Sequence, residues 1–338
     1  MTRLAPLLLT LLALAAAGCG AREETIAAPA PERVTLVLDY FPNADHAGIY
    51  AADFAEAGLD VDVQAPSDVS APLKLLAQGR ADVAVTYHPE LLLARAKRQD
   101  LVAIGALVQR PLNSVISLDG EVADPADLRG KRVGVGGVPS DEALLRAVAA
   151  EGGIPYESIE QVAVGFNLTP ALLSGRVDAV LGAYWNIEGA ELERRGARPT
   201  ILRLEEIGVP SYDELVLVAT RETVRERGPL LRRFLRALAE GHADVRTDPA
   251  GQAVPLLRAN PDLREEVVAQ QVQDTVPVFF PDDRSKPWGY LDPEEWRTFA
   301  QWMVRNRLVE GTPDVAQSFT NEFLPGEGAR PAEDTPAG

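Results

Sequence analysis

Apolar and polar positions follow two different periods along this chain. Short runs of β-branched and other apolar residues predict strands, and longer stretches with apolar residues at helical spacing predict helices. The predicted strands are residues 34–39, 59–64, 81–86, 102–106, 132–135, 161–164, 179–182 and 215–219. The predicted helices are residues 46–57, 71–78, 90–98, 141–151, 169–173, 187–195, 229–245, 263–271 and 293–307. Strands that alternate with helices in this order are typical of an α/β fold built on a parallel sheet with crossover helices.

Two segments interrupt this alternation. Residues 112–127 form an extended run that leads into a turn rich in Pro and Asp, and residues 209–212 precede another apolar strand. We interpret both segments as places where the chain crosses between two lobes. The resulting division assigns residues 33–118 and 211–325 to lobe one, and residues 119–210 to lobe two.

The N-terminal segment has the composition of an export signal, with a basic residue at Arg3, an apolar run over residues 4–17 and then Gly18. The apolar run is shorter than the ~20 residues that a membrane-spanning helix needs. We therefore expect residues 1–18 to be a signal peptide that is removed. Cys19 follows directly and is the only cysteine, so it cannot form an internal disulfide. Small residues followed by cysteine resemble a bacterial lipobox, which implies lipidation of Cys19.

Two segments are rich in Ala, Pro and Glu and lack apolar periodicity. Residues 19–32 are predicted to be the lipidated cysteine and a flexible tether, and residues 326–338 a disordered tail. The residues between them are numerous enough for two lobes with their own cores.

The charge of the chain limits its partners. The formal net charge is −17, from 33 basic and 50 acidic residues. Such a surface would repel phosphate backbones and anionic lipid head groups. We therefore expect no nucleic-acid partner, and contact with a membrane only through the lipid anchor.

Aromatic and polar residues recur where predicted strands end. In open α/β sheets, ligands bind at this carboxyl edge. One such residue in isolation is more often a cap or a packing residue, but recurrence at the same structural position on both lobes favours a ligand site. The candidate ligand-binding residues are Tyr40, Asn43, Asp45, His46, Tyr87, Asn113, Ser140, Asp141, Tyr184, Trp185, Tyr212 and Glu214.

The glycine-rich turn over residues 134–141 joins a predicted strand to a helix. Its glycines would let backbone N–H groups approach a ligand closely. The turn is not a dinucleotide fingerprint, because Pro139 stands where the third glycine is required. Gly130-Lys131-Arg132 also fails as a phosphate loop, because no Ser or Thr follows the lysine.

The candidate site contains few cations, so a sulfonate or phosphate would meet carboxylates where it needs Arg or Lys. A neutral or weakly basic aromatic ring fits better. Rings such as Tyr40, Tyr87, Trp185 and Tyr212 could stack on it, each aromatic pair contributing about 0.5–1.5 kcal/mol beyond burial. Glu214 could accept a hydrogen bond from a ring amino group. A 4-aminopyrimidine offers both features.

Metal and cofactor chemistry has little support in the sequence. The three histidines are His46, His88 and His242, and no paired ligand spacing accompanies them. Two of them, His46 and His88, follow predicted strands, so a zinc site remains an alternative. We expect no resident metal, no cofactor and no catalysis.

Several motifs resemble one known group, the thiamine-precursor branch of periplasmic binding proteins, whose members bind formylaminopyrimidine and share a fold with hydroxymethylpyrimidine phosphate synthase. The similar stretches are residues 38–43 (LDYFPN) with His46 and Tyr50, 87–90 (YHPE), 107–114 (LVQRPLNS), 182–186 (GAYWN), 212–217 (YDELVL), and 288–293 (WGYLDP) with Trp296. The resemblance extends over nearly all of residues 33–324.

This resemblance implies a type II periplasmic-binding-protein fold, with two α/β lobes and a ligand cleft between them. It also implies a monomeric extracytoplasmic binding protein that delivers an aminopyrimidine to an ABC permease and its ATPase. The group also contains riboflavin, sulfonate and nitrate relatives, which leaves those ligands as alternatives. The synthase branch uses a cysteine-rich motif that this chain lacks, which counts against an enzyme. A synthase-like enzyme or a metal-binding protein that uses His46 and His88 is the less favoured alternative.

Overall fold

The computed structural model describes residues 30–309, 311 and 314–326. The predicted signal peptide, Cys19, most of the tether and nearly all of the tail lie outside these residues. Within the described residues, ten strands form two five-stranded sheets. None of the described helices is both long and apolar enough to cross a membrane.

The first sheet has the strand order β2-β1-β3-β10-β4. Its strands are β1 (Glu32–Val37), β2 (Leu59–Gln64), β3 (Val83–Tyr87), β4 (Leu101–Val108) and β10 (Leu215–Thr220). Strand β1 pairs in parallel with β2 and β3, whereas β10 runs antiparallel to both of its neighbours, β3 and β4. The sheet is therefore mixed, with its antiparallel strand contributed by a distant part of the sequence.

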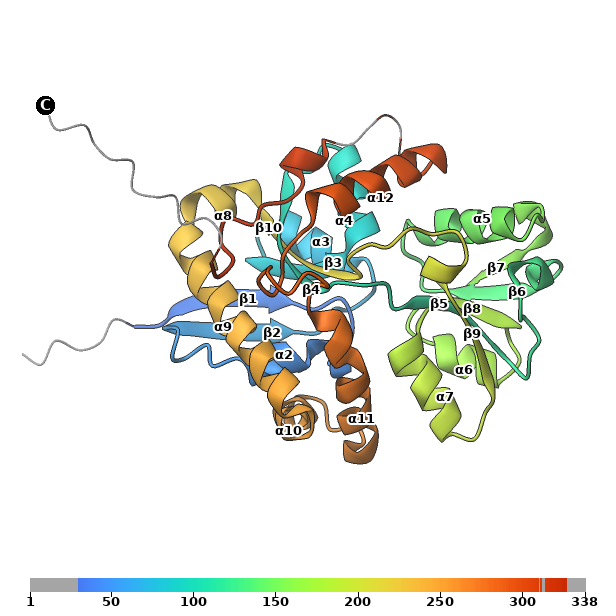
Figure 1. Cartoon of the computed structure of the whole chain (residues 1–338), viewed down its shortest axis with the longest axis horizontal. Helices are drawn as coiled ribbons and strands as arrows, with labels where there is room; N and C mark the ends of the chain where they lie inside the picture. Colours follow the sequence, from blue (N-terminus) through green and yellow to red (C-terminus); the bar gives the residue numbers. More distant parts are fainter. Residues whose placement is uncertain (1–29, 310, 312–313, 327–338) are drawn as a thin grey trace, which may run out of the picture. The chain divides into compact units, whose positions relative to one another are not determined.

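Helices cover both faces of the first sheet (Figure 1). Successive side chains of a strand point to opposite faces, so Leu36 packs with α2 (Ala47–Ala51), α9 (Gly228–Thr247), α10 (Pro249–Ala259) and α11 (Glu265–Thr275). The next residue, Val37, packs with α3 (Ala71–Ala77), α4 (His88–Ala96) and α12 (Pro293–Arg305). The short helix α8 (Arg221–Glu226) follows β10. Strands buried on both faces explain the continuous apolar runs in the sequence.

The second sheet has the order β7-β6-β8-β5-β9, in which β5 runs antiparallel to β8 and β9. Its strands are β5 (Asn113–Leu118), β6 (Arg132–Val135), β7 (Glu160–Ala163), β8 (Ala179–Tyr184) and β9 (Pro199–Arg203). Its helices are α5 (Asp141–Glu151), α6 (Leu168–Leu173), the π-helix η4 (Trp185–Gly189) and α7 (Ala190–Arg194). Helix α5 lies on one face and α6 and α7 on the other (Figure 1).

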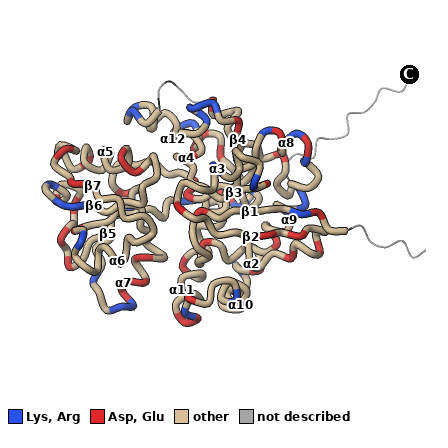
Figure 2. The backbone as a smooth tube through the Cα atoms, turned by 180° about the vertical axis from the view of Figure 1, so that it is seen from behind, with Lys and Arg blue, Asp and Glu red and all other residues tan. Residues whose placement is uncertain are grey.

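The remaining short helices are one-turn 3-10 segments. They are η1 (Ala44–His46), η2 (Pro125–Leu128), η3 (Tyr156–Ser158), η5 (Leu204–Glu206), η6 (Val276–Phe279) and η7 (Val315–Gln317). Acidic and basic positions are interspersed over the helices and loops of both sheets (Figure 2).

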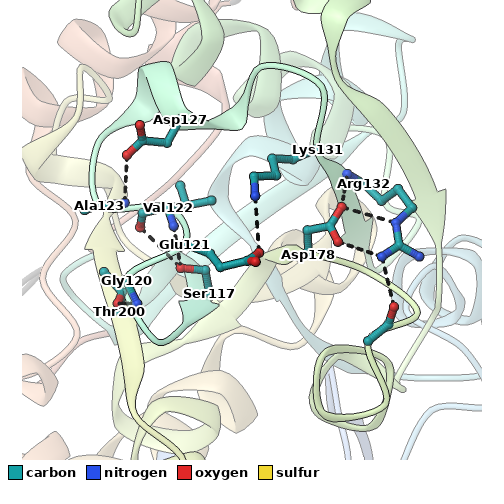
Figure 3. Close-up of polar contacts among 11 residues, drawn as sticks. Ser117, Gly120, Glu121, Val122, Ala123, Asp127, Lys131, Arg132, Asp178 and Thr200 are labelled. Atoms are coloured by element: carbon teal, nitrogen blue, oxygen red, sulfur yellow. Dashed lines mark hydrogen bonds and ion pairs between the residues drawn. The ribbon is translucent and has the colours of Figure 1, made fainter.

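An ion pair ties together the starts of two strands in the second sheet (Figure 3). Arg132 donates from Nη2 to Oδ1 of Asp178 at 2.6 Å and from Nε to Oδ2 at 3.2 Å. The backbone N–H of Arg132 donates to the same Oδ2 at 2.8 Å. Lys131 reaches Glu121 at 3.3 Å beside this pair. These contacts hold β6 to β8, which both lead toward the cavity described below.

A close helix contact holds η1 and α2 in place. A Cβ at Gly48 would lie 2.2 Å from the His242 ring, and a Cβ at Gly241 would lie 2.5 Å from the carbonyl oxygen of Gly48. Both distances are too short for any side chain, so glycine is required where α2 meets α9. This contact holds α2 against α9 directly after the segment that carries Asp45 and His46.

The predicted α/β class and the division into two sheets with their own helices are confirmed, but several details were wrong. The sheets are mixed rather than parallel, because the first strand after each crossing enters its new sheet antiparallel to its neighbours. Residues 113–118 were expected in lobe one and form β5 of the second sheet instead. Strand β9 and helices α8 and α10 were not expected. The other lobe boundaries remain predictions.

Candidate functional site

The two chain crossings bring the carboxyl ends of β3, β4 and β8 beside the first residues of β10 and β5. The chain leaves β4 for β5 through residues 109–112, and returns to β10 after η5. At the first residue of β10, Leu215 pairs with Tyr87 and with Val108, the last residues of β3 and β4. At the first residue of β5, Asn113 pairs with Tyr184, the last residue of β8. The carboxyl ends of strands from both sheets therefore lie at the crossings.

A cavity lies at these strand ends. Its lining combines carboxyl groups, tyrosine rings and small or apolar residues from both sheets. The lining residues are Asp39, Tyr40, Asn43, Val69, Tyr87, Pro89, Asn113, Gly136, Val138, Ser140, Asp141, Leu144, Gly165, Leu168, Gly182, Tyr184, Ile187, Glu188, Tyr212 and Glu214. A concave site with aromatic walls and a few convergent polar groups is typical of small-molecule binding.

Most of the candidate residues from the sequence line this cavity. They are Tyr40, Asn43, Tyr87, Asn113, Ser140, Asp141, Tyr184, Tyr212 and Glu214. The rule that ligands bind at the carboxyl ends of strands therefore predicted where these residues meet. Whether each one contacts a ligand stays a prediction.

Three candidates lie outside the lining. Asp45 is completely buried and accepts a hydrogen bond from Asn186 at 2.7 Å. His46 is also buried, and its Nε2 lies 2.9 Å from Oδ1 of Asp39. The ring of Trp185 lies under the Arg203 guanidinium at 4.2 Å, and its indole N–H points to the Pro111 carbonyl at 3.4 Å. None of the three is a lining residue of this cavity, and Trp185 lines a separate cavity together with Arg203.

Two lining carboxyl groups were missed as candidates. Asp39 is the residue before Tyr40, at the carboxyl end of β1, so the strand-end rule could have found it. Glu188 lies in η4, which continues β8 directly, and its Oε2 accepts from the backbone N–H of Tyr184 at 2.7 Å. Because η4 is one turn of π-helix, the helical period expected for this stretch would not have placed Glu188 on the cavity side.

His46 orients Asp39. The Nδ1 atom of His46 accepts from the backbone N–H of Asn43 at 3.2 Å, so the proton of the neutral ring is on Nε2. That nitrogen then donates to Oδ1 of Asp39. The Asp39 side chain held in this way belongs to the cavity lining. His46 therefore positions a cavity residue instead of lining the cavity itself.

The cavity is acidic and has no cation to balance it. Its twenty lining residues include Asp39, Asp141, Glu188 and Glu214, but no Lys, Arg or His. Burial raises the pKa of Asp141 to about 7, and it does the same for Glu188 and Glu214. Burial also raises the pKa of Tyr87, Tyr184 and Tyr212 well above the usual value. Such a site favours a ligand that donates hydrogen bonds and carries no negative charge.

Glu214 is occupied by protein donors. Its Oε2 accepts from the backbone N–H groups of Leu112 at 2.7 Å and Asn113 at 2.9 Å, and from the Tyr212 hydroxyl at 3.2 Å. Its Oε1 accepts from the Tyr184 hydroxyl at 3.3 Å. A carboxylate has about four acceptor sites. Glu214 therefore joins the two crossing segments, in addition to lining the cavity.

Asp141 fills the glycine-rich turn. Its Oδ2 accepts from the backbone N–H groups of Gly137 at 2.6 Å and Val138 at 3.0 Å. The backbone N–H of Ser140 donates to Oε1 of Glu90, from helix α4 of the first lobe, at 2.9 Å. These N–H groups were expected to approach a ligand. They donate instead to the carboxyl groups of Asp141 and Glu90, so these three N–H groups are not free to bind an anionic ligand.

An aromatic cluster connects the two lobes beside the cavity. The Tyr40 hydroxyl donates to the backbone carbonyl of Phe166 at 3.0 Å. The rings of Tyr40 and Phe166 meet edge to face at 4.6 Å between centroids, and Phe41 joins them at 5.1 Å from Phe166. Phe41 is 47% exposed, so the cluster extends from the cavity wall to the surface.

The histidines that suggested a metal do not come together. The described residues contain no group of three or more His, Cys, Asp or Glu side chains able to hold a metal ion. His88 packs on Trp296 with 3.8 Å between ring centroids, and burial lowers its pKa to about 3. His242 packs on Trp288, and its Nδ1–H donates to the Leu238 carbonyl at 2.7 Å. Both are packing residues of the core.

Known proteins resemble this chain in sequence and in fold. A family model described as NMT1/THI5 like matches residues 43–252. The formylaminopyrimidine-binding protein of Halalkalibacterium halodurans is 35% identical over 294 residues, which cover 85% of this chain and 88% of that protein. The 4-amino-5-hydroxymethyl-2-methylpyrimidine phosphate synthase of Legionella pneumophila is 26% identical over 301 residues, which cover 87% of this chain and 92% of that protein.

Among solved structures, the alkanesulfonate-binding protein SsuA from Xanthomonas axonopodis pv. citri, bound to MOPS, superimposes with a TM-score of 0.67. The two sequences are 19% identical, and the match covers 87% of this chain and 99% of that one. This likeness shows the periplasmic-binding-protein fold. Since the family model and the first relative both match across most of the described lobes, this chain belongs to the NMT1/THI5-like family.

Proposed function

We propose that this solute-binding protein takes up a thiamine pyrimidine precursor, of the formylaminopyrimidine or hydroxymethylpyrimidine type, and delivers it to an ABC importer without chemical turnover. The observation that carries the proposal is the cavity, which combines four carboxyl groups with four tyrosines and no cation among its lining residues. An aminopyrimidine has a flat face for the tyrosine rings and an amino group that donates to a carboxyl oxygen. The formylaminopyrimidine-binding relative supports the same ligand class.

The carboxyl groups of the cavity lining support an amino-substituted ring. A ligand N–H that donates to Asp39, Asp141 or Glu188 replaces a hydrogen bond to water, and the bond to an ionised partner contributes about 1.5–3 kcal/mol. Asp39 is pre-oriented by His46, so less side-chain freedom is lost on binding. The hydroxyls of Tyr40, Tyr184 and Tyr212 already donate to protein acceptors, so these three tyrosines offer their ring faces to a pyrimidine.

The synthase-like alternative has less support from the site. His46 faces Asp39 and His88 packs on Trp296, so neither histidine lines the cavity. The only cysteine of the chain, Cys19, precedes the described domain. Binding without turnover is therefore the function that the geometry supports best.

Calorimetric titration tests the ligand class. Formylaminopyrimidine or hydroxymethylpyrimidine should bind with a Kd of about 1 μM or tighter, which corresponds to ~8 kcal/mol of binding free energy. Mass spectrometry of protein purified under native conditions and then denatured should release a small molecule of the same class. The bound pyrimidine should be recovered unchanged after prolonged incubation.

Two results would count against the proposal. Binding of neither pyrimidine, together with a co-purified molecule of another class, would remove the assigned ligand and leave the binding-protein fold. Conversion of a bound pyrimidine to a product would favour the synthase-like alternative. Heat-denatured protein in the same titration is the control for nonspecific uptake.

Lipid anchoring is part of the same proposal. Cys19→Ser should move the protein from the membrane fraction to the soluble extracytoplasmic fraction, because a serine hydroxyl does not receive the diacylglycerol group. Fractionation and labelling with a radioactive fatty acid measure the change. If wild type and Cys19→Ser fractionate alike and neither carries label, the tether is not lipidated. The ligand titration is unaffected by this outcome, since it concerns residues of the cavity.

A further inference from the structure

A buried polar contact joins the two lobes behind the cavity. Asp45, in η1 of the first lobe, is 0% exposed, and Asn186, in η4 of the second lobe, is 1% exposed. Nδ2 of Asn186 donates to Oδ1 of Asp45 at 2.7 Å and to Oγ1 of Thr275 at 2.7 Å. The Thr275 hydroxyl in turn donates to the Gln271 carbonyl at 2.7 Å. The two hydrogens of the amide and the hydrogen of the hydroxyl are therefore all used.

Two acceptor oxygens remain on this contact. Oδ2 of Asp45 and Oδ1 of Asn186 are both buried, and neither has a hydrogen-bond partner. Each belongs to one of the two groups joined by the 2.7 Å hydrogen bond: Oδ2 is the second oxygen of the Asp45 carboxyl group, and Oδ1 is the oxygen of the Asn186 amide. Buried polar atoms without a partner cost about 1–3 kcal/mol each. One additional hydrogen between the two groups would satisfy both oxygens.

We propose that Asp45 is a neutral carboxylic acid that pairs with the Asn186 carboxamide, its Oδ2–H donating to Oδ1 of Asn186 while Nδ2 of Asn186 donates to Oδ1 of Asp45. The acid and the amide then face each other through two complementary hydrogen bonds. This pair holds η1 of the first lobe against η4 of the second. Neither residue lines the cavity, so both affect it by positioning the residues that do. Glu188 in η4 is the cavity residue that Asn186 helps to place.

The surroundings of Asp45 favour its neutral form. Burial raises its pKa well above the usual value, and the hydrogen bond from Asn186 only partly offsets this. The charged groups that act on it within the described residues are the carboxyls of Asp39, Glu188 and Glu214, which come from the end of β1, from η4 and from the residue before β10. The negative charge of each of these three carboxyl groups opposes the ionisation of Asp45. Helix α11 contacts the pair through the Thr275 hydroxyl, and the neighbouring Asp274 of the same helix lines a separate cavity together with Asn186.

Ionisation would weaken the contact between the lobes. A carboxylate at Asp45 has no hydrogen to offer to Oδ1 of Asn186, and its negative charge then faces a carbonyl oxygen. Gln271 adds a second link across the lobes by donating from Nε2 to the Ile187 carbonyl at 3.1 Å, and this link does not titrate. The pair therefore makes the lobe contact sensitive to pH without making it wholly dependent on pH.

Replacing Asp45 by asparagine tests the pair without any ligand. The amide is isosteric with the acid and donates to Oδ1 of Asn186 at every pH. In wild type, the folded state keeps a proton on Asp45 that the unfolded state releases above about pH 4, so the stability from this group falls as pH rises toward its folded pKa. The stability of Asp45→Asn relative to wild type should therefore increase with pH. We expect the unfolding equilibrium constant of Asp45→Asn to be at least about tenfold smaller than that of wild type near pH 8, equal to ~1.4 kcal/mol.

Urea unfolding of both proteins between about pH 4 and about pH 8 measures this difference. Equal unfolding constants at every pH would overturn the proposal, because Asp45 would then bind no extra proton in the folded state. Failure of Asp45→Asn to fold would also overturn it, since a neutral isostere should replace a neutral acid. Asp45→Ala is the matched control, and should destabilise at every pH because it leaves Nδ2 of Asn186 without one acceptor.

Infrared difference spectroscopy gives an independent measurement. The wild-type spectrum minus the Asp45→Asn spectrum near neutral pH should contain the carbonyl band of a protonated carboxyl group. A difference spectrum with carboxylate bands instead would show Asp45 ionised and would exclude the acid–amide pair. The outcome is separate from that of the pyrimidine titration, because neither variant nor wild type needs ligand here.

Discussion

Glu214→Ala should lower the free energy of unfolding by at least about 3 kcal/mol. The substitution leaves the backbone N–H groups of Leu112 and Asn113 buried and without an acceptor, and each such loss costs about 1–3 kcal/mol. It also removes the acceptor of the Tyr212 and Tyr184 hydroxyls. Because these four groups belong to the crossing segments and to the end of β8, the loss should loosen the junction of the two lobes.

Denaturant unfolding of wild type and variant measures this loss. The free energy of unfolding should depend on denaturant concentration with the same slope in both proteins. Glu214→Gln is the matched control, because its amide oxygen can still accept from both backbone N–H groups while its NH₂ faces the Tyr184 hydroxyl. We expect Glu214→Gln to lose about 1 kcal/mol, since one neutral acceptor replaces a charged one. An alanine variant as stable as the glutamine variant would mean that the four contacts do not stabilise the junction.

An alkanesulfonate should bind at least about a thousandfold more weakly than the aminopyrimidine, a difference of ~4 kcal/mol. A sulfonate carries a full negative charge into a cavity with four carboxyl groups and no lining cation. The backbone N–H groups of Gly137 and Val138, which could hold an anion, already donate to Asp141. A buried anion without a cation or free donors has no compensation for its lost hydration.

Calorimetry with ethanesulfonate and nitrate, beside the pyrimidine, measures this discrimination. Asp141→Ala should raise the affinity for ethanesulfonate by about tenfold, because it frees two N–H groups and removes one negative charge. Asp141→Asn is the control for charge alone, since its amide oxygen keeps both N–H groups occupied. Tight sulfonate binding by the wild type with no pyrimidine binding would replace the proposed ligand class and leave the fold assignment intact.

Local sequence patterns determined most of the secondary structure. Continuous apolar runs predicted most of the strands that are buried on both faces, and residues 59–64 and 132–135 match β2 and β6 at both ends. Strand β9 was missed because Pro199–Arg203 is only half-buried, and a half-buried edge strand has a weak apolar signal. Helix α10 was missed because Pro255 stands inside it, and proline normally ends a helical pattern.

The tertiary structure decided which lobe each crossing strand belongs to. The pattern of residues 113–118 predicts extended backbone equally well on either side of the crossing. Only pairing with β8 and β9 assigns it to the second sheet, as antiparallel β5. The same holds for β10, which lies between β3 and β4 although more than a hundred residues separate it from either. Pairing of distant strands leaves no trace in the local period of a sequence.

The sequence by itself determined the place of the candidate site and much of its chemistry. Residues after strands meet at one edge of a sheet, so the sequence alone predicts that Tyr87 and Tyr184 belong to the same site. It could not separate Tyr184, which lines the cavity, from Trp185, which does not, since successive side chains at a strand end point in opposite directions. It also could not show that Glu214 and Asp141 bind the chain's own N–H groups. Those roles depend on which backbone donors the folded chain brings within hydrogen-bond distance, and only tertiary contacts between distant segments decide that.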